Sequence, residues 1–281
     1  MGLVINTNIA ALNTTRVLRR STLALNKSLE RLSSGLRINR AADDAAGLAI
    51  AEGLASQVRG LRVAQRNAQD GINLVQTAEG ALSEVSNMLQ RMRELAVQAA
   101  NGTLTTTNRA NIDGEFQQLK GQINDTVQRV EFNGITPVSS ATAVVLQTGV
   151  DAGQTTTVTG TNNFSTVGGT GAAQLGGING SVLTGADGSA ASTAISALDL
   201  AIGIIVTARA GLGATQNRLE FTISTLAIQE ENSAASESAI RDANIAIETI
   251  AFTRNQILVA AGTSVLAQAN LVPQTALQLL G

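Results

Sequence analysis

The two ends of the 281-residue chain carry apolar residues spaced by seven, and this spacing constrains the fold most. A strict repeat of seven keeps one apolar seam facing a partner helix, because it matches the roughly 3.5 residues per turn of a supercoiled helix. Chain ends usually fray, so seams at both termini predict helices that need partners. The N-terminal seam comprises Val4, Ala11, Leu18, Leu25 and Leu32, with Leu29 and Leu36 in the second seam position; the C-terminal seam comprises Ala251, Leu258, Val265, Val272 and Leu279. The sequence therefore predicts an assembly protein.

The composition favours slender helix packing and argues against catalysis. Hydrophobic residues make up 44% of the chain and aromatic residues 2%, so the core must consist of small aliphatic side chains, which let helices approach closely. The chain has no His and no Cys, which removes disulfides, the usual zinc ligands and the commonest general acid or base. Asp43 and Asp44 point about 100° apart if they lie on a helix, so they do not converge on a metal. We expect no enzyme, cofactor or metal site; an enzyme with its site in the Gly/Thr-rich middle is the rival from another class.

The charge is unevenly placed along the chain. Residues 1–66 hold ten Arg or Lys against four Asp or Glu, and the remainder holds nine against seventeen. A basic segment is one mark of nucleic-acid binding, but here the basic residues alternate with seam positions and lack aromatic stacking partners. We favour a basic segment that faces an acidic helical segment of the same polymer, supplied by Glu220, Glu230, Glu231, Glu237, Asp242 and Glu248.

No membrane-spanning or secretory segment is expected. The longest continuous apolar stretch, Leu200–Val206, is interrupted by Gly203 and is too short to cross a bilayer. Without a recognisable secretory signal, these rules alone predict a cytoplasmic chain.

The middle of the sequence predicts helices on both sides of a small β-hairpin. Apolar residues recur at alternating spacings of three and four at Val75, Ala78, Leu82, Val85, Leu89, Met92, Ala96 and Ala99. A second, shorter stripe follows at Phe116, Leu119, Ile123 and Val130. From Thr193 a third stripe, broken only by Arg209 and Gln216, comprises Ile195, Leu198, Ile202, Ile205, Leu212, Leu219, Ile223 and Leu226. Two short strands are expected at 142–147 and 154–159, and Pro273 is expected to kink or end the last helix.

These patterns predict a mainly α fold: a long antiparallel coiled-coil-like rod with paired N- and C-terminal helices, and a small β-hairpin region at the far tip. We expect three parts. Residues 1–42 and 242–281 form a terminal helical domain, residues 43–160 and 193–241 form a helical rod domain with the hairpin, and residues 161–192 form a Gly/Ser/Thr-rich tip loop.

Several motifs resemble one known family. They are Val4–Asn8, Leu32–Asn39, Asp43–Gly47, Gln90–Gln98 and Phe132–Gly134 and, near the other end, Gly262–Gln274. Together they resemble the conserved ends of bacterial flagellins, in a short form without outer domains. The family's hook–filament junction protein shares flagellin-like ends and is the alternative.

The resemblance implies a secreted, extracellular subunit of the bacterial flagellar filament, exported unfolded by the type III route and polymerised through its terminal helices for swimming motility. The implied partners are copies of itself, an export chaperone, the filament cap and hook-junction proteins, and the innate-immune receptor of animal hosts; no nucleic acid and no membrane insertion are expected. Receptor contact is implied for Arg91, Leu95 and Glu115. Because Leu95 lies off the Val75–Ala99 stripe, we expect it to be exposed beside Arg91.

Overall fold

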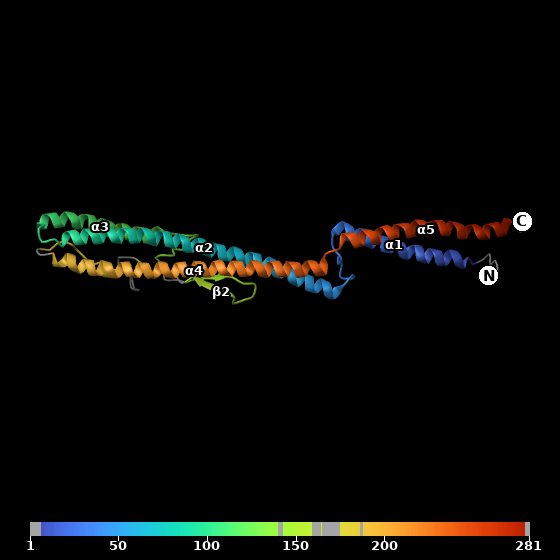
Figure 1. Ribbon diagram of the computed structural model, residues 1–281, viewed down its shortest axis with the longest axis horizontal. Helices are drawn as coiled ribbons and strands as arrows, with labels where there is room; N and C mark the ends of the chain where they lie inside the picture. The colour runs from blue at the N-terminus through green and yellow to red at the C-terminus, as the bar shows by residue number, and fades with distance from the viewer. Residues whose placement is uncertain (1–6, 140–142, 159–163, 165–174, 186–187, 279–281) are drawn as a thin grey trace. The chain divides into compact units, whose positions relative to one another are not determined.

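The computed structural model describes residues 7–139, 143–158, 164, 175–185 and 188–278, with side chains of the last helix up to Leu271 (Figure 1). The elements are α1 (Ile9–Ser34), α2 (Ala45–Ala99), α3 (Thr106–Arg129), β1 (Val144–Gln147), β2 (Thr155–Val158), the 3-10 helix η1 (Gly176–Ile178), α4 (Ser189–Arg241) and α5 (Ile245–Gln278). This confirms the mainly α fold with paired terminal helices and a small hairpin.

The chain forms two compact units. Unit 1 comprises Met1–Val58 and Glu231–Gly281, and unit 2 comprises Arg59–Glu230. The three-part division expected from the sequence stays a prediction.

In unit 1, α1 and α5 run antiparallel. Asn8 caps α1 by accepting a hydrogen bond from the Ala11 amide at 3.0 Å, and its Nδ2 donates to the carbonyl of Ala269 at 2.8 Å. Gly35 ends α1 because its φ of 73° suits glycine, and its amide donates to the Arg31 carbonyl at 2.9 Å. The helix that carries the N-terminal seam therefore ends at Ser34, before the last predicted seam residue, Leu36.

The segment between α1 and α2 is held against the junction of α4 and α5. The Arg37 amide donates to the Arg241 carbonyl at 2.7 Å, and the Ala243 amide donates to the Gly35 carbonyl at 2.9 Å. Asp44 then accepts from the Gly47 amide at 2.9 Å at the start of α2. A carboxylate in this position satisfies a free amide of the first turn.

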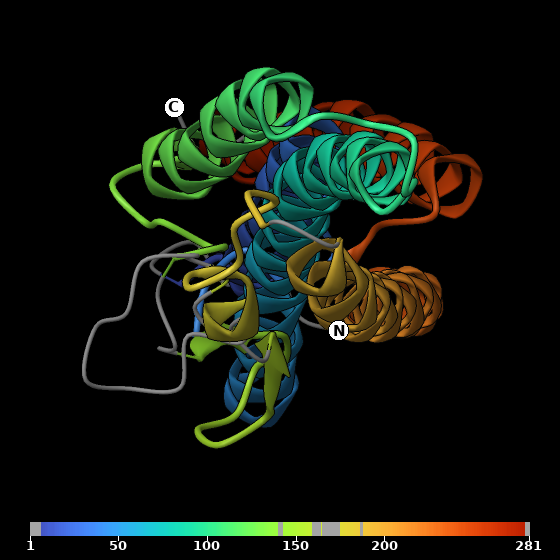
Figure 2. The same ribbon diagram turned by 90° about the vertical axis from the view of Figure 1, so that its left-hand side faces the viewer.

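The core of unit 2 lies where α2 meets α3 and α4, and in the end view of Figure 2 α2 lies between these two helices. Every residue of the predicted Val75–Ala99 stripe is buried, as are Leu198, Ile205, Leu212, Leu219 and Leu226 on α4. The stripes read from the sequence are thereby confirmed as the core.

The expected exposure of Leu95 is wrong, because its side chain is only 2% exposed. Leu74, Ala81 and Leu95 are buried at intervals that follow a second heptad line on α2, beside the first. A helix that packs against one partner buries one stripe, but α2 packs against α4 on one side and α3 on the other and therefore buries two. The sequence prediction assumed one buried stripe on α2, so it placed Leu95 at the surface.

The predicted hairpin is confirmed, but it does not form a tip. Val144 pairs with Val158 and Gln147 with Thr155 in an antiparallel ladder. The hairpin lies along α2, where Asn67 Nδ2 donates to the Gln147 carbonyl at 2.9 Å. A Cβ at Gly71 would collide with Leu146, so this glycine leaves room for the hairpin to pack on the helix.

Two further observations concern the long helices. The structure excludes one of the two effects expected of Pro273, because α5 continues past it to Gln278; the expected kink stays a prediction. By length and composition α4 is apolar enough to cross a membrane, with a window of mean hydropathy 1.8, although the sequence showed only a short continuous apolar run. A core helix of a water-soluble protein passes the same test, and α4 supplies the buried stripe of unit 2.

Candidate functional site

The contact between α1 and α5 uses the predicted α1 seam. Ala11, Leu18, Leu25 and Leu32 are half-buried on the inner face of α1, and a Cβ at Gly262 of α5 would lie 3.2 Å from Leu18. Among the described residues of these two helices, the fully buried side chains are Ser21 and Ser28. A contact that buries two serines and only part of each leucine leaves most of the apolar surface of the pair open.

Two residues of the predicted α5 seam are exposed in the subunit. Leu258 is 48% exposed and Val265 55% exposed. They belong to a line of exposed apolar residues, here called the outer stripe, formed by Ile247, Ile250, Ile257, Leu258 and Val265. The inner face of α5 instead carries half-buried residues at Phe252, Val259, Gly262 and Leu266. One helix thus presents two neighbouring apolar faces, and the residues that the structure describes cover one of them.

The remaining predicted seam residues divide into three groups. Leu29 is 56% exposed, and Leu36 is half-buried in an antiparallel bridge with Asp242. Ala251 is half-buried on α5. Val4 and Leu279 lie outside the described residues, as does the side chain of Val272. The role of all these positions in assembly stays a prediction.

Basic and acidic segments already meet within the subunit. Arg31 pairs with Glu248 at 3.5 Å in unit 1, and Arg62 pairs with Glu230 at 2.6 Å in unit 2. The hydrogen bond from Arg62, with a second from Gln65, lowers the pKa of Glu230. Exposed ion pairs add little stability, because solvent screens them.

A network of hydrogen bonds fixes the turn between α1 and α2. Asp43 pairs with Lys27 at 2.7 Å and accepts from the amides of Asn39 and Arg40 at 3.3 Å each. Glu30 accepts from Asn39 at 3.0 Å and from Arg40 at 2.8 Å. The hydrogen bond from Lys27 is the main reason that the pKa of Asp43 falls from 3.8 to about 2; desolvation is the next largest effect and opposes it, and the amides of Arg40 and Asn39 lower the pKa further.

Because the folded state lowers this pKa, Asp43 is expected to stabilise the fold fully above pH 4, and this contribution is lost as the pH falls toward 2. Asp43→Asn removes the titrating group. We therefore expect a gap in melting temperature between wild type and Asp43→Asn at pH 5 that narrows steadily toward pH 2, measured by circular dichroism. A gap of constant size across this range would contradict the assignment.

The three residues of the implied receptor contact lie together, but differently from expectation. Arg91 bonds Glu115 at 2.9 Å and Glu94 at 3.0 Å, and these carboxylates raise the pKa of Arg91. Arg91 thus joins α2 to α3 at the surface. Leu95 lies beneath this pair in the core.

Arg109 is an important residue that the sequence did not reveal. Its side chain is 2% exposed, and its guanidinium donates to the carbonyls of Ala99 at 3.0 Å, Asn101 at 3.1 Å and Gly185 at 3.1 Å. The last carbonyls of a helix have no partner within it. Arg109 supplies donors at the end of α2 and ties the segment before α4 to the start of α3.

Comparison with known proteins identifies the family. A model of the bacterial flagellin N-terminal helical region matches residues 5–140, and a model of the C-terminal helical region matches residues 195–280. The chain belongs to the bacterial flagellin family. This flagellin is 42% identical over 292 residues to the flagellar filament 33 kDa core protein of Treponema phagedenis, a match that covers 99% of this chain and 100% of the relative.

Further relatives agree with this assignment. The chain is 44% identical over 280 residues to the flagellin of Halalkalibacterium halodurans, with 99% and 100% of the two chains covered. A solved structure described as a flagellar hook-associated protein from Vibrio parahaemolyticus matches with a TM-score of 0.60 over 71% of this flagellin and 100% of that chain. Its identity is 15%, so this likeness shows the fold alone and does not favour the junction-protein alternative.

Proposed function

We propose that this flagellin is the structural subunit of a bacterial flagellar filament and acts by self-assembly rather than by catalysis. The observation that carries the proposal is the uncovered outer stripe on α5. Exposed apolar lines of this kind are a mark of protein–protein contact, and the family membership makes another copy of the chain the partner.

The energetics favour assembly once several copies share contacts. Full burial of one Leu or Ile side chain contributes about 1.5–3 kcal/mol to the free energy of association. Association costs at least about 4 kcal/mol in lost translational and rotational freedom. The five residues of the outer stripe are enough to offset this cost when neighbouring copies cover them. Contacts between different faces of successive copies do not close on themselves and produce an open helical polymer.

The direct test is polymerisation of the purified chain. Sulfate strengthens apolar burial, so we expect added ammonium sulfate to convert the protein into filaments that sediment and are visible by electron microscopy. Amorphous precipitate without filaments would count against the proposal. Abundance in filaments sheared from cells distinguishes a flagellin, which dominates them, from a junction protein.

We propose further that the subunit is secreted and that residues from about Ile240 onward bind an export chaperone beforehand. The outer stripe supports this, because an amphipathic helix with an uncovered apolar face fits an apolar groove. Deletion of residues 242–281 is expected to abolish chaperone capture in a pull-down, and Arg129→Ala, a change at an exposed residue of α3, serves as the control. Capture that survives the terminal deletion would refute the proposal. The filament cap and hook-junction proteins are proposed as later partners.

We propose that the host innate-immune receptor contacts the surface at Arg91 and Glu115. The supporting feature is an exposed guanidinium held by two carboxylates. Arg91→Ala and Glu115→Ala are each expected to lower signalling by purified monomer in a cell reporter assay by about tenfold. Leu95→Ala is unsuitable as a surface probe, because loss of this buried side chain costs about 2–5 kcal/mol of stability. Unchanged signalling by both surface variants would contradict the contact.

A further inference from the structure

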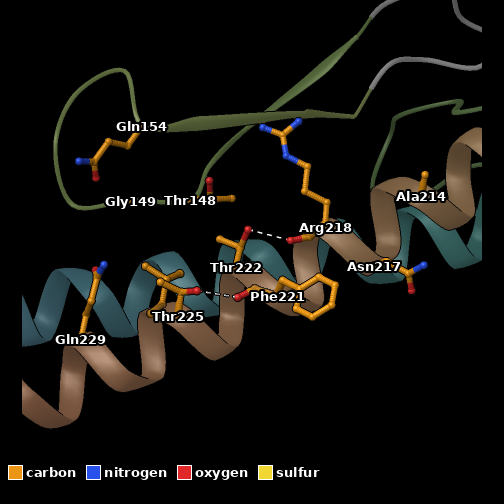
Figure 3. Close-up of a pocket in the computed structure, with 11 residues that line it drawn as sticks. Thr148, Gly149, Gln154, Ala214, Asn217, Arg218, Phe221, Thr222, Thr225 and Gln229 are labelled. Atoms are coloured by element: carbon orange, nitrogen blue, oxygen red, sulfur yellow. Dashed lines mark hydrogen bonds between the residues drawn. The ribbon is translucent and has the colours of Figure 1, made fainter.

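Unit 2 contains a groove that the core does not explain. It lies between the hairpin turn and α4, has a volume of about 760 Å³, and is lined by Thr148, Gly149 and Gln154 on one side and by residues such as Arg218, Phe221 and Thr225 on the other. In Figure 3 the side chain of Arg218 rises from α4 toward the hairpin.

Two residues that line the groove, Phe221 and Arg218, have side chains that the subunit leaves exposed or without a charged partner among the described residues. Phe221 is 75% exposed, whereas Phe116 and Phe164 are buried in the core. Arg218 is the charged residue of the lining, and within the part of the chain that the structure describes its guanidinium forms no ion pair. A matching occupant would therefore offer an apolar side chain beside a carboxylate.

The chain itself carries such a pair on α2. Val97 is 50% exposed and Glu94 has a side chain 68% exposed, and residues three apart share one face of a helix. Glu94 shares Arg91 with Glu115, so this patch has more negative than positive charge. Its charge is complementary to that of the groove.

A second exposed pair, Ile228 and Glu231, lies on α4 itself, within a few turns of the groove. Two copies that joined through one shared surface would form a closed pair, not a polymer. An open polymer needs two different surfaces, and Glu94 with Val97 provides one far from the groove. The groove lies level with Ala68, which packs with Leu219, and Glu94 lies 26 residues farther along α2, or about 40 Å at roughly 1.5 Å per residue.

We propose that the groove of one copy receives the Glu94–Val97 face of the next copy, with Arg218 against Glu94 and Phe221 against Val97. The occupant is a second copy of this flagellin, so the inference rests on the proposed function and specifies one of its contacts. Repetition of the contact along successive copies extends the polymer.

Cross-linking of filaments tests the contact directly, since the natural chain contains no cysteine. A variant with both Val97→Cys and Phe221→Cys, polymerised and treated with a short bismaleimide, should give a ladder of covalent dimers, trimers and longer chains. Each single-cysteine variant should stay monomeric, and a mixture of the two should give dimers. Filaments of the double variant that yield only monomers would overturn the contact while leaving the proposed function intact.

Charge reversal provides an independent readout. Arg218→Glu and Glu94→Arg should each raise the concentration needed for polymerisation by about tenfold, because like charges would then face each other. The combined variant should recover most of this loss, whereas Glu94→Arg should not rescue Arg129→Glu. Circular dichroism checks that every variant folds. A combined variant no better than the single ones would overturn the pairing, and a wild-type chain that forms no filaments at all would overturn both this contact and the proposed function.

Discussion

Replacement of Leu258 by aspartate is expected to abolish filament formation while leaving the isolated subunit folded. Leu258 lies on the outer stripe and is half exposed in the subunit, so a carboxylate there stays hydrated before assembly. In the polymer the same carboxylate would be buried without a partner, which costs several kcal/mol. We expect unchanged thermal unfolding of the monomer and no sedimentable polymer at concentrations at which wild type assembles completely.

Two matched variants separate this effect from loss of the α1–α5 pair. Gln256→Asp changes an exposed residue of α5 outside the stripe and is expected to assemble far better than Leu258→Asp. Leu25→Asp changes the inner face of α1 and is expected to destabilise the monomer as well as to prevent assembly. Normal filaments from Leu258→Asp would remove the outer stripe from the assembly surface.

Replacement of Arg109 by leucine is expected to destabilise unit 2 by about 2–4 kcal/mol. Three carbonyls would lose a charge-assisted hydrogen bond; the contact to Ala99 is buried, and those to Asn101 and Gly185 are partly buried. A buried acceptor left unsatisfied costs about 1–3 kcal/mol, and a partly buried one costs less because water can replace the donor. Leucine replaces much of the volume of the arginine side chain, so the loss of stability reflects the missing hydrogen bonds more than a cavity. Urea unfolding followed by circular dichroism measures the change.

Arg129→Ala is the control for this experiment. Arg129 has a side chain 79% exposed that pairs only with Asp125 four residues earlier among the described residues, and exposed substitutions change stability by about 0.5 kcal/mol or less. Equal stability of Arg109→Leu and Arg129→Ala would mean that the buried guanidinium adds nothing to the fold.

The repeating apolar patterns were enough to predict the helices and the core of unit 2. The threes and fours from Val75 to Ala99 are buried in full, and both short strands lie within the ranges expected. These predictions succeeded because each depends on a local periodicity of apolar residues. Packing of one face of a helix or strand against one neighbour is enough to produce that periodicity.

The failures arise where a residue has more than one partner. Leu95 is buried because α2 is covered by both α3 and α4, and one stripe predicts one partner. The sequence also did not show which face of α5 meets α1: Gly262, where the lack of a side chain allows close approach to Leu18, lies on that face, whereas Leu258 and Val265 lie on the outer stripe. Arg109 serves backbone carbonyls as distant as Gly185, and no periodicity marks such a contact.

We expect the outer stripe to be open in the subunit and covered in the filament. Amide hydrogen exchange with mass spectrometry measures this, because helices with few buried contacts open more readily than core helices. We predict that residues 245–271 exchange much faster than residues 82–92 in the monomer, and that assembly slows their exchange by at least about a hundredfold. Exchange of residues 245–271 that is as slow in the monomer as in the filament would contradict the account.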